Sequence, residues 1–198
     1  MLADDFPEAR VVTFGYDASV AKFSRLWRGV DTSGLADYGK NLAHAVRNTR
    51  QAVDGEHPVP ALDVPIYFIG HSLGGLASLE YALNYAPKDR LLYIITLGSP
   101  LHGTYFSIGF GPCIKQMRMD SPYLQKLHQQ LKEATHIRLL TIGSNTDALI
   151  IPHSSALLPE IPYAQCEEIE ALGHVAFLFS PRILRRIIAY LRKNGVVA

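Results

Sequence analysis

The sequence predicts an α/β fold, with a mostly parallel β-sheet covered by helices on both faces. Short apolar runs alternate with helical patterns along the chain, which is the order that parallel strands joined by crossover helices require. Several of these runs are almost entirely apolar, as expected for strands that are buried on both faces. The chain has 198 residues, of which 48% are hydrophobic. That length supports one substantial core, and we expect a single domain over residues 1–198.

Local patterns place the elements of this fold. We expect strands at residues 10–14, 64–69, 91–97, 136–142 and 164–169, where β-branched and aromatic residues gather. We expect helices at residues 34–53, 72–85, 123–134 and 181–193. The last of these begins at a proline and ends in basic residues, as helices commonly do. Residues 54–60 form a polar connection, and residues 103–122 are rich in glycine and aromatic residues without clear periodicity.

Charge and hydropathy exclude several kinds of partner. The formal net charge is +1 and the basic residues are scattered. We therefore expect no concentrated positive charge that would attract nucleic acid. The exception is the group Arg182, Arg185 and Arg186, which we interpret as a solvated helix face. No apolar run reaches the roughly 20 residues that span a bilayer, so we expect no transmembrane segment. Residues 1–10 are acidic and unlike a secretory signal. We expect a cytoplasmic location, or secretion if a leader has been trimmed.

The two cysteines do not indicate a metal centre. Cys113 and Cys166 lie far apart and lack the spacing of metal ligands. We expect two thiols and no metal site, while a single disulfide between them stays open as an alternative.

The motif Gly-His-Ser-Leu-Gly-Gly at residues 70–75 is typical of a nucleophile elbow between a strand and a helix. A serine hydroxyl is a poor nucleophile at neutral pH, so it has to be held exposed beside a base on a tight turn. Gly70 and Gly74 allow such a turn, and Gly75 and Ala77 let the helix lie close to the sheet. We therefore expect Ser72 to be a nucleophile, and the helix N-terminus to favour developing negative charge. The alternative is a glycine-rich turn whose serine has no role.

A base for Ser72 should follow the last strand, where an imidazole reaches the carboxyl edge of the sheet. His174 lies there, and we assign it as general base and acid. We expect His71 to pack beside the elbow. The other histidines lack a matching partner, although two of them, His102 and His153, fall on loops near the same edge: His44, His57, His102, His128, His136 and His153.

The third member should be a carboxylate that follows a strand between Ser72 and His174, because it holds the imidazole in the correct tautomer. Asp147 meets this requirement. Four other carboxylates fit less well: Asp89 in a solvated connection, Asp120 as a cap of the helix near residue 122, and Glu160 and Glu170.

With these residues in place, the chain resembles lipases and esterases of the α/β-hydrolase superfamily, especially small bacterial triacylglycerol-lipase-like members. The segment Leu-Gly-Ser-Pro-Leu-His-Gly-Thr at 97–104 is similar to a Gly-Thr-Pro-His-x-Gly loop of that family, residues 147–159 to its acid loop, and residues 173–181 to its histidine loop. A more distant likeness at residues 11–17 is to lipid-remodelling serine hydrolases, including relatives of the glycosylphosphatidylinositol deacylases. The resemblance implies an α/β-hydrolase fold.

The sequence departs from this family in one respect. Family members usually begin with a strand ending in His-Gly, whose loop donates a backbone N–H to the oxyanion hole, and no His-Gly precedes Ser72. The resemblance implies the N–H of Leu73 as the other donor. Losing one donor costs about 3 kcal/mol. We expect the first strand to be missing; the alternative is that a backbone N–H near Tyr16 fills the vacancy.

The expected reaction is cleavage of a carboxylic ester or lipid through an acyl-enzyme on Ser72, with no cofactor or metal. Residues 103–122 could form a flap or acyl pocket, with apolar walls from Tyr105, Phe106, Ile108, Phe110 and Ile114, or could simply cover the sheet edge. We expect substrate contacts from His71, His102, Tyr105 and Phe106, and transient contact with a lipid interface. Two rivals stay open: an acyltransferase, thioesterase or amidase with the same triad, and an impaired hydrolase-like binding domain.

Overall fold

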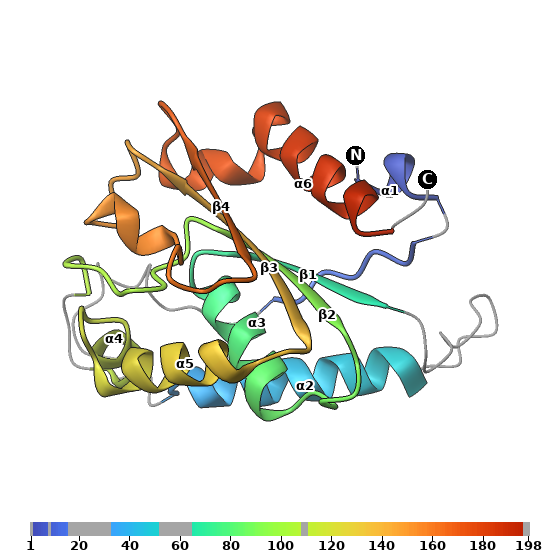
Figure 1. The fold of residues 1–198 in the computed structure, drawn as a ribbon, viewed down its shortest axis with the longest axis horizontal. Helices are drawn as coiled ribbons and strands as arrows, with labels where there is room; N and C mark the ends of the chain where they lie inside the picture. Colours follow the sequence, from blue (N-terminus) through green and yellow to red (C-terminus); the bar gives the residue numbers. More distant parts are fainter. Residues whose placement is uncertain (1, 8, 16–32, 52–64, 108–110, 196–198) are drawn as a thin grey trace.

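Among the residues that the structure describes, four parallel strands form the sheet, in the order β1-β2-β3-β4 (Figure 1). The computed structural model describes residues 2–7, 9–15, 33–51, 65–107 and 111–195. The strands are β1 (Ile66–His71), β2 (Leu92–Leu97), β3 (Ile137–Ser144) and β4 (Ala164–Ile169). Because every pairing is parallel, the carboxyl ends of all four strands meet at one edge of the sheet.

Helices cover both faces of the sheet, as predicted (Figure 1). Alternate side chains point to opposite faces: Ile94 and Leu139 belong to one core cluster, and Ile95 and Leu140 to the other. The first cluster includes side chains of α2 (Leu35–Gln51), α3 (Leu73–Asn84), α4 (Pro112–Gln116) and α5 (Pro122–Glu133). The second includes side chains of α6 (Pro181–Lys193), together with Phe6 next to α1 (Leu2–Asp5).

Prolines mark the first turns of α4, α5 and α6, where the missing N–H costs nothing. The N-cap of α5 is Ser121, whose hydroxyl oxygen accepts the Leu124 N–H at 3.2 Å. The alternative that Asp120 caps this helix is therefore wrong, because the Asp120 backbone has a positive φ of 55° and precedes the capping position. Helix α4 lies within residues 103–122. Because this helix is so short, its periodicity was not visible in the sequence.

The strand predicted at residues 10–14 is wrong. Within the described chain these residues form no ladder with another strand. Val11 and Val12 are 58% and 55% exposed, so this valine pair gains little from burial, and the Arg10 guanidinium donates to the Thr49 carbonyl on α2 at 3.3 Å. The other four strands are confirmed, with ends shifted by up to two residues where they can be compared.

The described residues test two further expectations, on the basic group and on the cysteines. Arg182, Arg185 and Arg186 are exposed on α6. Cys113 and Cys166 are not joined by a disulfide, so that alternative is wrong, and the Thr141 hydroxyl donates to the Cys166 sulfur at 3.3 Å. In the described ranges, no helix combines the length and apolar character that crossing a bilayer requires.

The close approach of α3 to β1 can be tested at Gly70. A Cβ at Gly70 would lie 2.5 Å from the Gly75 nitrogen and 2.6 Å from the Gly74 carbonyl atoms. Backbone atoms cannot yield without moving the helix, so Gly70→Ala should lower the free energy of unfolding by about 2 kcal/mol, within the cost of overpacking. Denaturant unfolding measures this loss. Gly15→Ala adds a Cβ in open space and serves as control; equal stability of the two variants would contradict the packing argument.

Candidate active site

Ser72 lies on the turn that joins β1 directly to α3. Its backbone adopts φ 55° and ψ −125°. Residues other than glycine rarely adopt this conformation, and it is strained. The turn is held because the Ser72 N–H donates to the Leu97 carbonyl at the end of β2, at 2.9 Å. Gly75 lets the helix approach β2, since a Cβ there would lie 2.1 Å from the Ser99 hydroxyl oxygen. This strained turn is the geometry expected of a nucleophile elbow.

The first turn of α3 leaves hydrogen-bond donors unused beside Ser72. Helix N-termini have backbone N–H groups without a partner inside the helix. Within the described residues, neither the Leu73 N–H nor the Ser72 side chain takes part in a hydrogen bond. Together with the helix dipole, these donors make the turn favourable for negative charge.

Asp147 and His174 form a buried pair at the same sheet edge. The His174 Nδ1 lies 2.7 Å from Asp147 Oδ2, and Asp147 is 1% exposed. The other oxygen, Oδ1, accepts the N–H groups of Leu149 at 2.9 Å and Ile150 at 3.1 Å. Burial raises the pKa of Asp147, but these hydrogen bonds outweigh it and the pKa is lowered overall. An ionised Asp147 accepts the Nδ1–H of His174, which leaves Nε2 as the basic nitrogen.

The close packing around Asp147 depends on Gly98, a residue whose role the sequence alone did not reveal. Gly98 follows β2 with a φ of +53°, and a Cβ there would lie 3.0 Å from both Asp147 Oδ2 and a ring carbon of Phe177. A glycine directly after an apolar strand was the available signal.

His71 connects the elbow to His174. Its Nε2 donates to the backbone carbonyl of His174 at 2.9 Å, and the two rings lie 4.7 Å apart between centroids. Burial lowers the pKa of His71, against a smaller opposing effect of the bond to that carbonyl. No hydrogen bond joins Ser72 to His174 in the part of the chain that the structure describes; the contact with His174 is made by His71, the residue before Ser72. This ring packs beside the elbow and supports the loop of His174.

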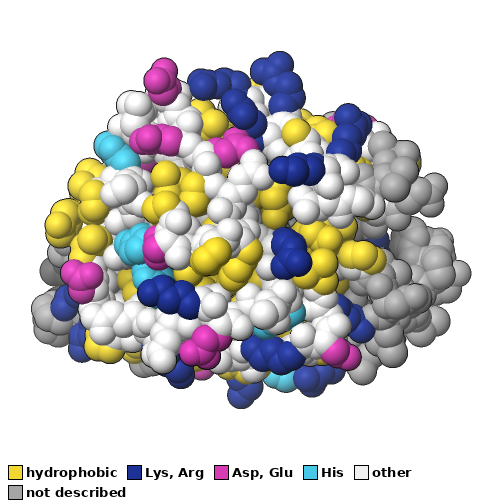
Figure 2. Space-filling view, in the orientation of Figure 1, with side chains coloured by type: hydrophobic (Ala, Val, Ile, Leu, Met, Phe, Trp, Pro, Cys, Tyr) yellow, Lys and Arg dark blue, Asp and Glu magenta, His cyan; other side chains and the backbone are white. Residues whose placement is uncertain are grey.

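The predicted substrate walls fall on one exposed segment. Tyr105 and Phe106 are 68% and 53% exposed. Thr104 anchors them: its hydroxyl donates to the Leu149 carbonyl at 2.7 Å and accepts the N–H groups of Phe106 and Ile151, both at 3.2 Å. The segment of Thr104, Tyr105 and Phe106, which we call the wall segment, is thus bonded to the loop that carries Asp147. Figure 2 shows hydrophobic side chains gathered at the left of the visible face, the side toward which the strands point in Figure 1.

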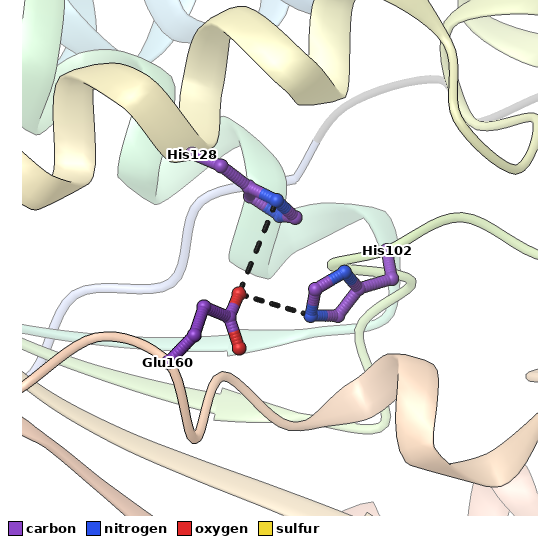
Figure 3. A group of neighbouring side chains, drawn as sticks. All are labelled: His102, His128 and Glu160. Atoms are coloured by element: carbon purple, nitrogen blue, oxygen red, sulfur yellow. Dashed lines mark ion pairs between the residues drawn. The ribbon is translucent and has the colours of Figure 1, made fainter.

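Several predicted site residues lie elsewhere. Tyr16, Ile108 and Phe110 fall outside the described residues, and Ile114 is half-buried on α4. Asp89 and Glu170 are exposed. Glu160 contacts His102, with Oε1 3.1 Å from Nε2, and His128 lies beside them (Figure 3). His102 therefore has a carboxylate partner of its own, outside the Asp147 and His174 pair.

Comparisons with known proteins identify the fold. No protein-family model matches this chain, and no curated protein sequence matches it either. Among solved structures, the chain is similar to the mature lipase BlEst2 of Bacillus licheniformis, with a TM-score of 0.60, 14% identity, and coverage of 81% of this chain and 75% of that one. It is also similar to a monoacylglycerol lipase of Paleococcus ferrophilus, with a TM-score of 0.56, 15% identity, and coverage of 81% and 76%.

A third structure, lipase B of Aspergillus fumigatus, gives a TM-score of 0.61 at 16% identity, with coverage of 79% of this chain and 41% of that one. The chain thus matches less than half the length of this fungal lipase. The α/β architecture and these likenesses together show an α/β-hydrolase fold, with four parallel strands among the described residues.

The lowered pKa of His71 predicts a pH dependence of stability. In the unfolded chain a histidine takes up its proton near pH 6.5, whereas in the folded protein it does so at lower pH. The unfolded state therefore binds more protons, and His71 makes the protein less stable as the pH falls through about 6.5. His71→Gln keeps an N–H donor but cannot titrate, so its free energy of unfolding should fall less between about pH 8 and about pH 5.

Denaturant unfolding at the two pH values measures this difference. His44→Gln is the control, because His44 is exposed on α2 and its replacement should leave the wild-type pH dependence in place. Parallel pH dependence in wild type and His71→Gln would show that His71 does not titrate as described.

Proposed function

We propose that the protein is a serine hydrolase that cleaves carboxylic esters through an acyl-enzyme on Ser72. One observation carries the proposal: the strained turn of Ser72 lies at the same sheet edge as the hydrogen-bonded pair of Asp147 and His174, with His71 in contact between them. A nucleophile, a base and a carboxylate that orients the base are the three groups that acyl transfer by serine requires. The similar structures described above are named as lipases, which agrees with this reaction class.

The proposed reaction has two halves. The Ser72 hydroxyl attacks the ester carbonyl carbon while His174 Nε2 takes its proton. The tetrahedral intermediate collapses, the alcohol leaves with the proton from His174, and the acyl group stays on Ser72. Water then attacks the acyl-enzyme, again with His174 as base, and releases the carboxylic acid and free Ser72. Asp147 stays ionised throughout and stabilises the positive charge that forms on His174.

The proposed oxyanion hole uses the Leu73 N–H, which has no hydrogen-bond partner among the described residues. A donor aimed at the developing charge contributes about 3 kcal/mol to transition-state stabilisation. The second donor, which we predicted near Tyr16 as the alternative to a missing strand, stays a prediction.

We further propose that the substrate is presented at a lipid surface. The 3₁₀-helix η3 (His174–Leu178) carries the proposed base and exposes Val175 and Leu178, and Phe179, which follows it, is 79% exposed. Tyr105 and Phe106 are exposed on the wall segment. Exposed apolar side chains of this size mark interaction sites when they gather, and an ester in a lipid phase would meet them on its way to Ser72.

Ser72→Ala tests the reaction. It removes the nucleophile, and hydrolysis of p-nitrophenyl butyrate should fall by about 10⁴- to 10⁶-fold in kcat, as loss of a triad member does. Ser154→Ala, at an exposed serine of η2 (His153–Ala156), is the control and should keep wild-type turnover. A fluorophosphonate probe should label the wild type at Ser72, as read by peptide mass spectrometry. A folded wild type that neither turns over esters nor takes the label would favour the binding-domain rival.

Phe179→Ser tests the lipid surface. Hydrolysis of an emulsified triacylglycerol should fall about tenfold, because burying much of a phenylalanine in an apolar phase is worth about 1.5 kcal/mol, while turnover of a soluble short-chain ester should change little. Leu91→Ser is the matched control, since Leu91 is 37% exposed just before β2, at the amino end of the strand. Equal losses on both substrates would assign Phe179 to the catalytic site, not to surface binding.

A further inference from the structure

Three side chains from separate elements converge beside the carboxyl edge of the sheet. His102 lies on the loop after β2, His128 on α5, and Glu160 on the connection between η2 and β4 (Figure 3). Glu160 Oε1 is 3.1 Å from His102 Nε2 and 3.9 Å from His128 Nδ1, and one ligand atom from each residue lies within 4.8 Å of the others. Ligands of a tetrahedral zinc ion are about 3.3 Å apart when the bonds are about 2.0–2.1 Å long. Small side-chain rotations therefore bring all three atoms to bonding distance of one ion.

The hydrogen bonding of His128 prepares it as a ligand. Its Nε2 lies 2.9 Å from the Leu101 carbonyl oxygen, which can only accept, so Nε2 carries the proton. In the neutral ring Nδ1 then holds a lone pair, and it faces the carboxylate of Glu160. A histidine that binds a metal usually donates its other N–H to a backbone carbonyl in this way.

The facing of Nδ1 and Glu160 also points to a cation. With the His128 ring neutral, Nδ1 and the Glu160 carboxylate are two acceptors that repel each other, and a proton on Nδ1 or a metal cation between them turns that repulsion into attraction. His102 Nε2 lies on the same carboxylate oxygen, so one cation there can meet both imidazoles and Glu160. The rings of His102 and His128 meet edge to face, 4.4 Å apart between centroids, so the two imidazoles are in contact.

The backbone holds the three residues in place. Each has a fully buried neighbour in the sequence: Leu101 beside His102, Leu127 beside His128, and Ile161 beside Glu160. The His102 N–H donates to the Ser155 carbonyl at 3.0 Å, and the Ile161 N–H donates to the Leu158 carbonyl at 3.1 Å. A site held by such packing needs little rearrangement when it binds its ion.

We propose that His102, His128 and Glu160 form a zinc site, with water in the fourth position. Two imidazoles and one carboxylate suit Zn²⁺ better than Ca²⁺ or Mg²⁺, which prefer oxygen ligands alone. The single carboxylate leaves a net positive site when the ion is bound. The ion joins α5, the loop after β2 and the connection before β4, so it stabilises the fold independently of the reaction proposed for Ser72.

Calorimetric titration of the chelator-treated full chain with ZnCl₂ tests the proposal. The wild type should bind one equivalent. His128→Ala and Glu160→Gln should each bind more than about tenfold more weakly, because loss of an outer-shell partner alone costs about 10- to 100-fold. His153→Ala is the control. His153 lies on η2, between β3 and β4 as Glu160 does, but outside the cluster. This variant should bind zinc as the wild type does.

Two further readouts keep the test independent of folding defects in the variants. Co²⁺ in place of Zn²⁺ should give the visible absorption of a tetrahedral site in the wild type. Zn²⁺ should also raise the melting temperature of the wild type but not that of Glu160→Gln. Zinc binding that is equally strong in wild type, His128→Ala and Glu160→Gln would overturn the proposal, as would a wild type that binds no zinc. Ester hydrolysis is not used as a readout, so this outcome is separate from the test of Ser72.

Discussion

The structure around the site depends on one steric constraint, the direct passage from β1 into α3 without an intervening loop. Gly70 and Gly75 remove the two Cβ atoms that would collide, one with the backbone of the helix and one with Ser99. Because the chain reverses so sharply, Ser72 is left in a strained conformation. The same reversal places the first backbone N–H groups of α3 beside it. The strain of Ser72 and the unused donors are two results of a single close approach.

The carboxyl edge of the sheet gathers groups that are far apart in the sequence. Parallel pairing brings the ends of β2, β3 and β4 to one edge of the sheet, so the segments after these strands meet. Asp147 is where they converge: it accepts a hydrogen bond from His174 and two from its own loop, and it packs under Gly98 at the end of β2. A buried carboxylate stays charged only with such partners. The charge of Asp147 and its pairing with His174 therefore depend on the topology of the sheet.

Local patterns predicted most of the regular structure. Four strands and the helices α2, α3, α5 and α6 were readable because each carries its own periodicity or its own start signal. Residues 10–14 had the composition of a strand but no partner in the described sheet, and pairing is not visible in a short run of residues. That Ser72, Asp147 and His174 come to the same edge of the sheet was predictable from chain order, since parallel strands impose an order on the loops at their carboxyl ends. The cluster of His102, His128 and Glu160 was missed, because its members come from a loop, a helix and a connection whose proximity exists only in the folded chain.

The hydroxyl of Thr104 makes three hydrogen bonds, which is its full capacity of one donor and two acceptors. The hydroxyl joins its own segment to the loop that carries Asp147 by bonding main-chain atoms alone. None of the three bonds depends on which side chains stand at Tyr105 and Phe106. These two exposed side chains can therefore be exchanged, in evolution or by engineering, while the backbone around the buried carboxylate of Asp147 keeps its position.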